Sequence, residues 1–234
     1  MPHGIFITFE GVDGSGKSTH VRKLVEHLRG RRSPVVVTRE PGGTKVGEHI
    51  RNLLLRPGMG KMSSLTELIL MYAAREQHLE EVVRPALARG RVIISDRYND
   101  ASYAYQGYGR MLGARTVRAL DRAICGRTQP DLTLLLDLDP RVALERARRR
   151  TSRGGAKLTR FENHGLKFQQ RVRAGYLAMA RQEPRRIKVI AADRPAAEVQ
   201  SDIRKLVDGL LAKRLRLGPT ASQAARPAIK KRRS

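Results

Sequence analysis

A glycine-rich stretch near the start of the chain constrains its fold most strongly. Residues 11–18 read Gly-Val-Asp-Gly-Ser-Gly-Lys-Ser and fit the pattern G-x-x-x-x-G-K-[ST], in which glycines let backbone N–H groups approach phosphates closely. In this pattern Lys17 reaches the β- and γ-phosphates, and the Ser18 hydroxyl binds Mg²⁺. The sequence therefore predicts an ATP-binding loop made by Gly11, Val12, Asp13, Gly14, Ser15, Gly16, Lys17, Ser18 and Thr19.

The residues on either side of this loop supply the structural context that the pattern requires. Residues 5–9 are apolar, β-branched or aromatic, as expected of a buried parallel strand. After the loop, apolar residues recur at helical spacing, at Val21, Leu24, Val25 and Leu28. A helix starting here offers its positive N-terminus to a bound anion. A glycine turn without a ligand would not need lysine and a hydroxyl at the helix start, so we favour phosphate binding.

The rest of the chain alternates short apolar runs with helical patterns. Further strands are expected at residues 35–38, 92–96, 132–137 and 187–190. A long helical pattern covers residues 65–89, and Pro85 is expected to bend or shorten that helix. Five strands alternating with helices predict an α/β protein with the three-layer P-loop NTPase fold, in which helices cover both faces of a five-stranded parallel sheet.

The composition changes near the end of the chain. We expect one P-loop domain over residues 1–212, whose last helix covers residues 196–212. Residues 213–234 contain eight Lys or Arg and no Asp or Glu, which is typical of a disordered basic tail. Such a tail suits non-specific contact with nucleic acid.

The overall charge favours anionic ligands. Lys and Arg outnumber Asp and Glu by 47 to 22, giving a net charge of +25. Arginine supplies 36 of those cations, and codon bias accounts for most of this excess outside the motifs. Cys125 is the single cysteine, and the histidines lack zinc-site spacing. With no apolar run approaching ~18 residues and no room for a signal peptide, we expect a cytoplasmic protein without a membrane segment.

Polar residues follow two of the expected strands, at the sheet edge where open α/β sheets bind ligands. Arg39 and Glu40 come after the second strand and are expected at the mouth of the site. Asp96 ends the third strand, where it caps the strand or, as we favour, lies beside Mg²⁺. Residues 101–109 then hold three of the six tyrosines. Their spacing fits a sugar and base site and helix packing equally well.

A run of arginines occupies the region after the fourth strand. Charge runs usually mark a solvated helix face. This run continues into a loop that contains Gly154 and Gly155, so we expect a lid over ATP at about residues 148–163.

Four short motifs occur in order along the chain. They are residues 9–18, 38–44, 96–98 and 104–107, which read Phe-Glu-Gly-Val-Asp-Gly-Ser-Gly-Lys-Ser, Thr-Arg-Glu-Pro-Gly-Gly-Thr, Asp-Arg-Tyr and Ala-Tyr-Gln-Gly. Order and spacing resemble the thymidylate kinase family over roughly residues 4–212, and four motifs are far more specific than one. The resemblance implies a homodimeric enzyme that phosphorylates dTMP to dTDP with ATP and Mg²⁺, in dTTP synthesis.

The resemblance also implies roles for matching residues. Arg97 would clamp the dTMP phosphate, helped by Arg39 or Arg51. The other implied contacts are with the base for Arg75, Ser102 and Gln106, with the sugar hydroxyl and metal region for Asp13 and Glu40, and with the 2′ position of the sugar for Tyr105. Catalysis would use Lys17, Arg97 and an arginine of the lid, for which the candidates are Arg149, Arg153 and Arg160.

Two positions depart from the family pattern. The family commonly stacks a phenylalanine on thymine, whereas this chain has Met71, whose sulfur can pack against a ring. The lid commonly carries Asp-Arg-x-Glu, whereas Thr159 precedes Arg160 here. Met71 leaves open a kinase for another nucleoside monophosphate. The basic tail leaves open a nucleic-acid-binding protein that retains the fold, although the intact Lys17 and Asp96 argue against lost catalysis.

Overall fold

The computed structural model describes residues 4–30, 34–56, 61–152, 160–161 and 164–216. A parallel five-stranded sheet runs through the domain in the order β2-β3-β1-β4-β5. Its strands are β1 (Ile5–Glu10), β2 (Val35–Arg39), β3 (Val92–Asp96), β4 (Leu132–Asp137) and β5 (Ile187–Ala191). The α/β fold expected from the alternating pattern is confirmed.

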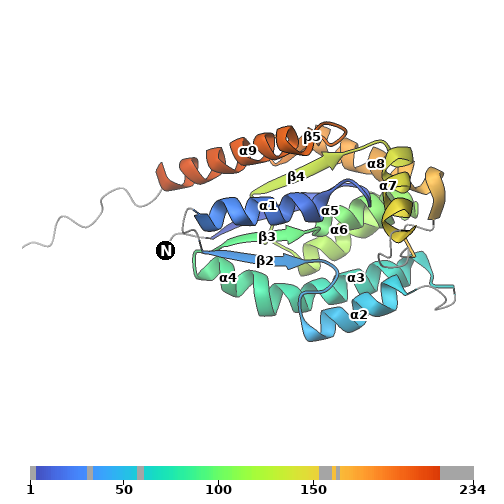
Figure 1. Cartoon of the computed structure of the whole chain (residues 1–234). Coiled ribbons are helices and arrows are strands. Elements are labelled where there is room, and N and C mark those ends of the chain that lie inside the picture. The colour runs from blue at the N-terminus through green and yellow to red at the C-terminus, as the bar shows by residue number, and fades with distance from the viewer. Residues whose placement is uncertain (1–3, 31–33, 57–60, 153–159, 162–163, 217–234) are drawn as a thin grey trace, which may run out of the picture.

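Helices cover both faces of this sheet and give the three layers visible in Figure 1. One face carries α1 (Lys17–Gly30) and α9 (Ala196–Arg216). The other elements are α2 (Lys45–Leu55), α3 (Ser64–His78), η1 (Leu79–Val83), α4 (Arg84–Ala88), α5 (Asn99–Ser102), η2 (Tyr103–Gly109), α6 (Gly113–Ile124), α7 (Pro140–Ser152) and α8 (Gly165–Gln182). Helix α2 packs on α3, and α7 packs on α8 near the carboxyl ends of the strands.

Successive residues of the central strands pack into the core on opposite faces of the sheet. Ile7 and Ile94 are fully buried with Leu24 of α1, whereas Phe6 and Ile93 are buried in a second cluster with α3 and η1. Side chains of a strand alternate between faces, so strands covered on both sides need apolar residues throughout. This double burial holds the carboxyl ends of β1 and β3, and the loops that follow them, in fixed positions.

Two helices differ from the sequence prediction. The helix expected over 65–89 is α3, a single π-helical turn at η1, and α4. The Arg84 N–H bonds to Leu79 O in this wider turn, directly before Pro85, which has no N–H to donate. Helix α9 ends at Arg216 rather than 212, and the Arg214 side chain bonds to Asp131. Helix α9 therefore includes the first residues that the sequence assigned to the tail.

No helix in the described ranges has the length and apolar content that crossing a bilayer requires.

The loop between β1 and α1 depends on left-handed backbone. Gly14 has φ +88, and a Cβ atom built there would lie 2.3 Å from the Ala143 carbonyl oxygen at the start of α7. A side chain is therefore excluded both by conformation and by the close approach of α7.

We predict that Gly14→Ala destabilises the protein by about 2 kcal/mol or more, since left-handed backbone alone costs about 1–2 kcal/mol. Chemical denaturation measures the change. Gly209→Ala is the matched control, because Gly209 lies in α9 with open space around its Cα and no positive φ. That control should stabilise the protein by about 0.5–1 kcal/mol. Equal stability of Gly14→Ala and wild type would contradict this account of the loop.

Candidate active site

Two connected pockets lie at the carboxyl edge of the sheet. The larger, of about 460 Å³, is lined by Asp13, Gly14, Gly16, Lys17, Ser18, Thr19, Arg39, Glu40, Arg51, Asp96, Arg97 and Arg146. The smaller, of about 100 Å³, is lined by Asp13, Glu40, Pro41, Arg51, Leu55, Met71, Arg75, Arg97, Tyr98, Ala101, Ser102, Tyr105, Gln106 and Phe161. Asp13, Glu40, Arg51 and Arg97 line both, so ligands in the two pockets would meet at these side chains.

The larger pocket is built around the glycine-rich loop. Lys17 Nζ donates to the carbonyl oxygens of Gly11 and Val12, each at 3.0 Å. Burial, with the positive charge of Arg97 nearby, lowers the pKa of Lys17 to about 8. A bound polyphosphate would oppose both effects by supplying negative charge. The Ser18 hydroxyl lies 3.2 Å from Asp96 Oδ2, so the two predicted metal-binding side chains are adjacent.

Arg97, which follows β3, has an unusual backbone conformation. Its φ of +75 lies in the left-handed region, which a non-glycine residue adopts only when its surroundings impose it. Three hydrogen bonds do so here. The Arg97 N–H donates to Phe9 O at 2.9 Å, the Ser95 hydroxyl donates to Arg97 O at 2.7 Å, and the Tyr98 N–H donates to Glu10 Oε1 at 2.8 Å.

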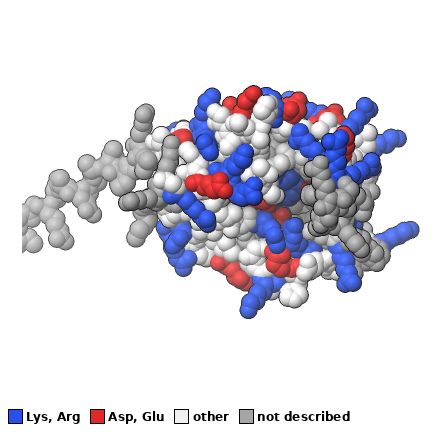
Figure 2. Space-filling view, viewed as in Figure 1, with Lys and Arg blue, Asp and Glu red and all other residues white. Residues whose placement is uncertain are grey.

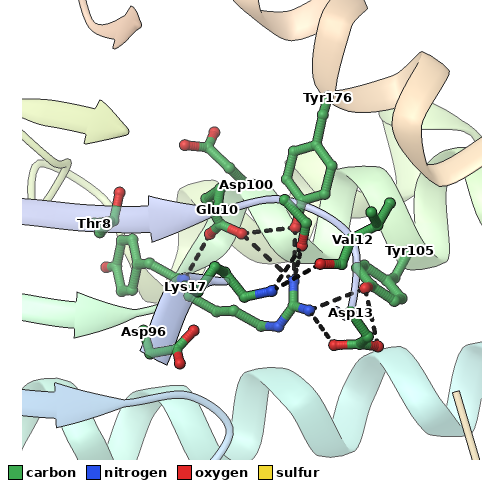
Figure 3. Close-up of polar contacts among 12 residues, drawn as sticks. Thr8, Glu10, Val12, Asp13, Lys17, Asp96, Asp100, Tyr105 and Tyr176 are labelled. Carbon is green, nitrogen blue, oxygen red and sulfur yellow. Dashed lines mark hydrogen bonds and ion pairs between the residues drawn. The ribbon is translucent and has the colours of Figure 1, made fainter. Parts of the chain in front are cut away.

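The Arg97 guanidinium is held as firmly as its backbone. Nη1 donates to Gly11 O and to the Tyr176 hydroxyl, both at 3.0 Å. Nη2 donates to Asp13 Oδ1 at 2.5 Å and to the Tyr105 hydroxyl at 3.0 Å. Figure 3 shows Asp13 of the loop, Tyr105 of η2 and Tyr176 of α8 converging on this cluster. Burial would raise the pKa of Asp13, but the nearby cations, first Arg97, lower it below its usual value.

Glu10, at the end of β1, is a buried acid beneath this cluster. Its carboxylate accepts a 2.6 Å hydrogen bond from Tyr176 and lies 3.8 Å from Arg97 Nη1. Burial, reinforced by Asp100 and only partly offset by Arg97, raises the pKa of Glu10 to about 7. Sequence reasoning assigned no role to Glu10 or Tyr176. An acid at the end of an apolar strand was the available signal for Glu10, whereas Tyr176 arrives from a distant helix.

The smaller pocket contains a second ordered arginine, Arg75 of α3. Its Nε donates to Glu40 at 2.7 Å, Nη1 to the Ser102 hydroxyl at 3.1 Å and Nη2 to Tyr98 O at 3.1 Å. His78 bonds the other Glu40 oxygen at 2.8 Å. An arginine has five N–H donors, so two remain on the Nη atoms for a ligand.

Apolar and amide groups complete the smaller pocket. Met71 is half-buried and lines it, as the family resemblance implied for the residue facing the base. The Gln106 amide donates to Glu67 at 2.8 Å, which leaves its carbonyl oxygen for other partners. Phe161 forms another wall, with its ring edge-to-face against Tyr105.

The remaining arginines expected in the site lie in different places. Arg39 pairs with Glu48 at 3.0 Å beside the larger pocket, and Arg51 donates to Pro41 O at 2.8 Å. Among the lid candidates, Arg149 is exposed and pairs with Glu145, and Arg153 lies outside the described residues, as do Gly154, Gly155 and Thr159. Arg160 lines neither pocket and bonds to Glu67 instead.

Arg146 of α7 lines the larger pocket, although sequence reasoning did not select it as a site residue. It stood in the same arginine run as the lid candidates, and spacing alone could not distinguish it from its neighbours.

A P-loop joined to a second, arginine-bearing pocket defines a phosphotransferase of the nucleoside monophosphate kinase class. The comparisons with known proteins narrow this class. The family model for thymidylate kinase matches residues 9–203. The chain is 46% identical to the thymidylate kinase of Symbiobacterium thermophilum, over 91% of this chain and 96% of that protein. It is 49% identical to the thymidylate kinase of Pseudomonas entomophila, over 89% of this chain and 97% of that protein. This chain belongs to the thymidylate kinase family.

A solved structure gives the same result for the fold. The crystal structure of thymidylate kinase from Ehrlichia chaffeensis superposes with a TM-score of 0.72 at 31% identity, covering 88% of this chain and all of that chain.

We predict that Glu10→Gln removes part of the pH dependence of stability. A folded-state pKa of about 7 lies above the ordinary 4.5, so between these values the folded protein binds more protons than the unfolded chain. This group therefore lowers the free energy of unfolding as pH rises from 4.5 to 7, by about 3 kcal/mol at most. Urea denaturation at pH 5, 6 and 7 should show a smaller decrease for the variant.

Glu40→Gln is the control for this experiment, because Glu40 is also buried but its pKa is lowered: Arg75 and His78 outweigh the effect of burial. Glu40 therefore stabilises the fold throughout pH 5 to 7, and its loss should leave the slope unchanged. A wild-type slope in Glu10→Gln would show that Glu10 does not titrate in this range.

Proposed function

We propose that this chain transfers the γ-phosphoryl group of ATP to dTMP across the junction of its two pockets. As a member of its family, it phosphorylates dTMP to dTDP with ATP as donor. In our proposal the donor phosphates bind the glycine-rich loop, and dTMP binds the smaller pocket. The observation that carries this arrangement is that Asp13, Arg51 and Arg97 line both pockets.

The chemical task is to bring two anions together. The dTMP phosphate is largely a dianion at pH 7, so the reaction needs no strong general base. Lys17, Arg51 and Arg97 supply positive charge where the two phosphates would approach, and such preorganised charge stabilises the transition state. Because four hydrogen-bonding partners hold the Arg97 guanidinium before any ligand arrives, little reorganisation is required during the reaction.

We propose that Ser18 and Asp96 hold the magnesium ion of Mg·ATP. Their oxygens are the ligand type that Mg²⁺ prefers, and they lie side by side. The described residues contain no group of three or more acidic, histidine or cysteine side chains suited to a metal. That finding fits an ion held mainly by phosphates and water. When bound, Mg²⁺ offsets negative charge on the donor phosphates.

The polar groups of the smaller pocket match a thymine base. Thymine presents carbonyl acceptors and one N–H donor. Arg75 retains two N–H donors, and the Gln106 carbonyl and Ser102 hydroxyl can accept. Met71 would pack its sulfur against the ring. Tyr105, bonded to Asp13 at 3.2 Å, would border the sugar beside Glu40.

For the lid we retain Arg149 and Arg153 as candidates for the arginine that reaches the transferred phosphoryl group. Arg146 joins them because it already lines the phosphate pocket.

Coupled ATP turnover with dTMP, dUMP, UMP, CMP, AMP and GMP tests the acceptor. We expect kcat/KM for dTMP to exceed that for dUMP by about 10-fold or more, because a methyl group in an apolar pocket contributes about 10–200-fold. The Lys17→Ala variant, which lacks the phosphate-binding ammonium, should lose most turnover. A higher kcat/KM for any other monophosphate would overturn the assignment of dTMP.

Two partner proposals remain. We propose a homodimer, in keeping with the family resemblance and with the half-exposed apolar side chains of Leu65 and Ile69 on α3. We also propose that the basic tail touches nucleic acid non-specifically; Lys and Arg are widespread on the visible face of the domain as well (Figure 2). The buried free Cys125 fits a reducing, cytoplasmic compartment.

Truncation after Arg216 tests the tail while keeping α9 intact. The deleted residues 217–234 carry five Lys or Arg and no acid. We expect kcat/KM to stay within about twofold while affinity for duplex DNA in low salt falls, because fewer phosphates are neutralised. Fluorescence anisotropy at several salt concentrations measures the affinity and its salt slope. Unchanged values of both would exclude the tail as the contact.

A further inference from the structure

Arg160 ties two segments that are far apart in the sequence. Its backbone N–H donates to Leu55 O at 3.3 Å, and its Nε donates to Leu54 O at 2.9 Å. These carbonyls belong to the last turn of α2, where helical carbonyls have no partner within the helix. A guanidinium there also interacts favourably with the helix dipole. Arg160 therefore caps α2 from the distant segment that contains Phe161.

Glu67 of α3 holds the other end of the same guanidinium. Its carboxylate is fully buried and accepts from Arg160 Nη2 at 2.6 Å, from Arg110 Nη2 at 2.7 Å and from Gln106 Nε2 at 2.8 Å. Burial would raise the pKa of Glu67, but the bonds from Arg110 and Gln106 and the charge of Arg160 lower it. Removing one partner of so buried a group leaves charge uncompensated.

Several residues that contact Arg160, Glu67 or their neighbours line the smaller pocket. Leu55, Gln106 and Phe161 all line it. Phe161 is 5% exposed and packs edge-to-face on Tyr105, with ring centroids 5.6 Å apart. The bond to Glu67 also sets which end of the Gln106 amide is left for a ligand. Arg160 itself lines neither pocket, so it acts through these neighbours rather than on a phosphate.

We propose that Arg160, bound to Glu67 and to the end of α2, is a positioning residue that sets affinity for the acceptor nucleotide by fixing Phe161, Leu55 and Gln106. This inference rests on the proposed function only in placing the acceptor base in the smaller pocket. The role that we propose for Arg160 differs from that of the lid arginines, which we expect near the transferred phosphoryl group.

Steady-state kinetics of the full-length chain with ATP and dTMP test the proposal. Arg160→Ala should raise KM for dTMP about tenfold, with kcat within about threefold of wild type and KM for ATP unchanged. Calorimetric titration with dTMP should show the same loss in Kd. Arg160→Lys, which keeps the charge but lacks the fork that reaches both Leu54 O and Glu67, should recover part of the affinity.

A double-mutant cycle tests the coupling to Glu67. Glu67→Gln should raise KM for dTMP by a similar factor, and the double variant should lose less than the product of the two factors, because both changes break one contact. Arg194→Ala is the matched control, since Arg194 pairs with Asp202 at 2.5 Å on the surface and lines neither pocket. Its KM for dTMP should equal that of wild type.

Two results would overturn the inference. A kcat lowered by a hundredfold or more with unchanged KM and Kd for dTMP would place Arg160 in phosphoryl transfer. Unchanged kinetics in both Arg160→Lys and Glu67→Gln, with folding verified by circular dichroism, would remove the cluster from acceptor binding. Failure of the proposed function is separately visible, because the wild-type enzyme would then not prefer dTMP.

Discussion

The hydrogen-bonded guanidinium of Arg97 is the interaction on which the rest of the site depends. Its backbone adopts φ +75, and its four side-chain hydrogen bonds reach the glycine-rich loop, η2 and α8. A cation whose side chain is only 14% exposed is stable only when it is paired and hydrogen-bonded. The requirement explains why Asp13, Tyr105, Tyr176 and the acid Glu10 converge there. The same cation then faces both pockets, where two phosphates would meet.

Burial and neighbouring charges shift the pKa values of the groups around Arg97 in different directions. It raises the pKa of Glu10 to about 7 and, with Arg97, lowers that of Lys17 to about 8, whereas nearby cations keep Asp13 ionised. The lowered pKa of Lys17 means that its surroundings disfavour its positive charge. The negative charge of a bound polyphosphate would offset this effect. A second arginine, Arg75, is held by a separate acid, Glu40, in the smaller pocket. In the arrangement that we propose, each end of the acceptor would meet a cation paired with its own carboxylate.

Glu67, beside the smaller pocket, is likewise a buried charge that is paired and hydrogen-bonded. One buried carboxylate, that of Glu67, binds Gln106, Arg110 and Arg160 from separate parts of the chain, beside the smaller pocket. Arg160, which stands in the arginine-rich stretch after the fourth strand, bonds to Leu54 of α2 and to Glu67 of α3. Charge runs identify cations, but they do not identify the acids that hold them.

The sequence by itself determined the sheet, the glycine-rich loop and the family, because strand burial, helical spacing and ordered motifs are local properties of the chain. Lys17, Ser18, Asp96 and Arg97 could be named for the same reason. Only the tertiary structure shows that Glu10 bonds to Tyr176, that Glu67 bonds to Arg160, and that Arg146 lines the larger pocket. Glu10 and Tyr176 are 166 positions apart in the sequence and meet only in the folded structure. The length of α9 and the π-helical turn before Pro85 were likewise decided by packing and hydrogen bonding.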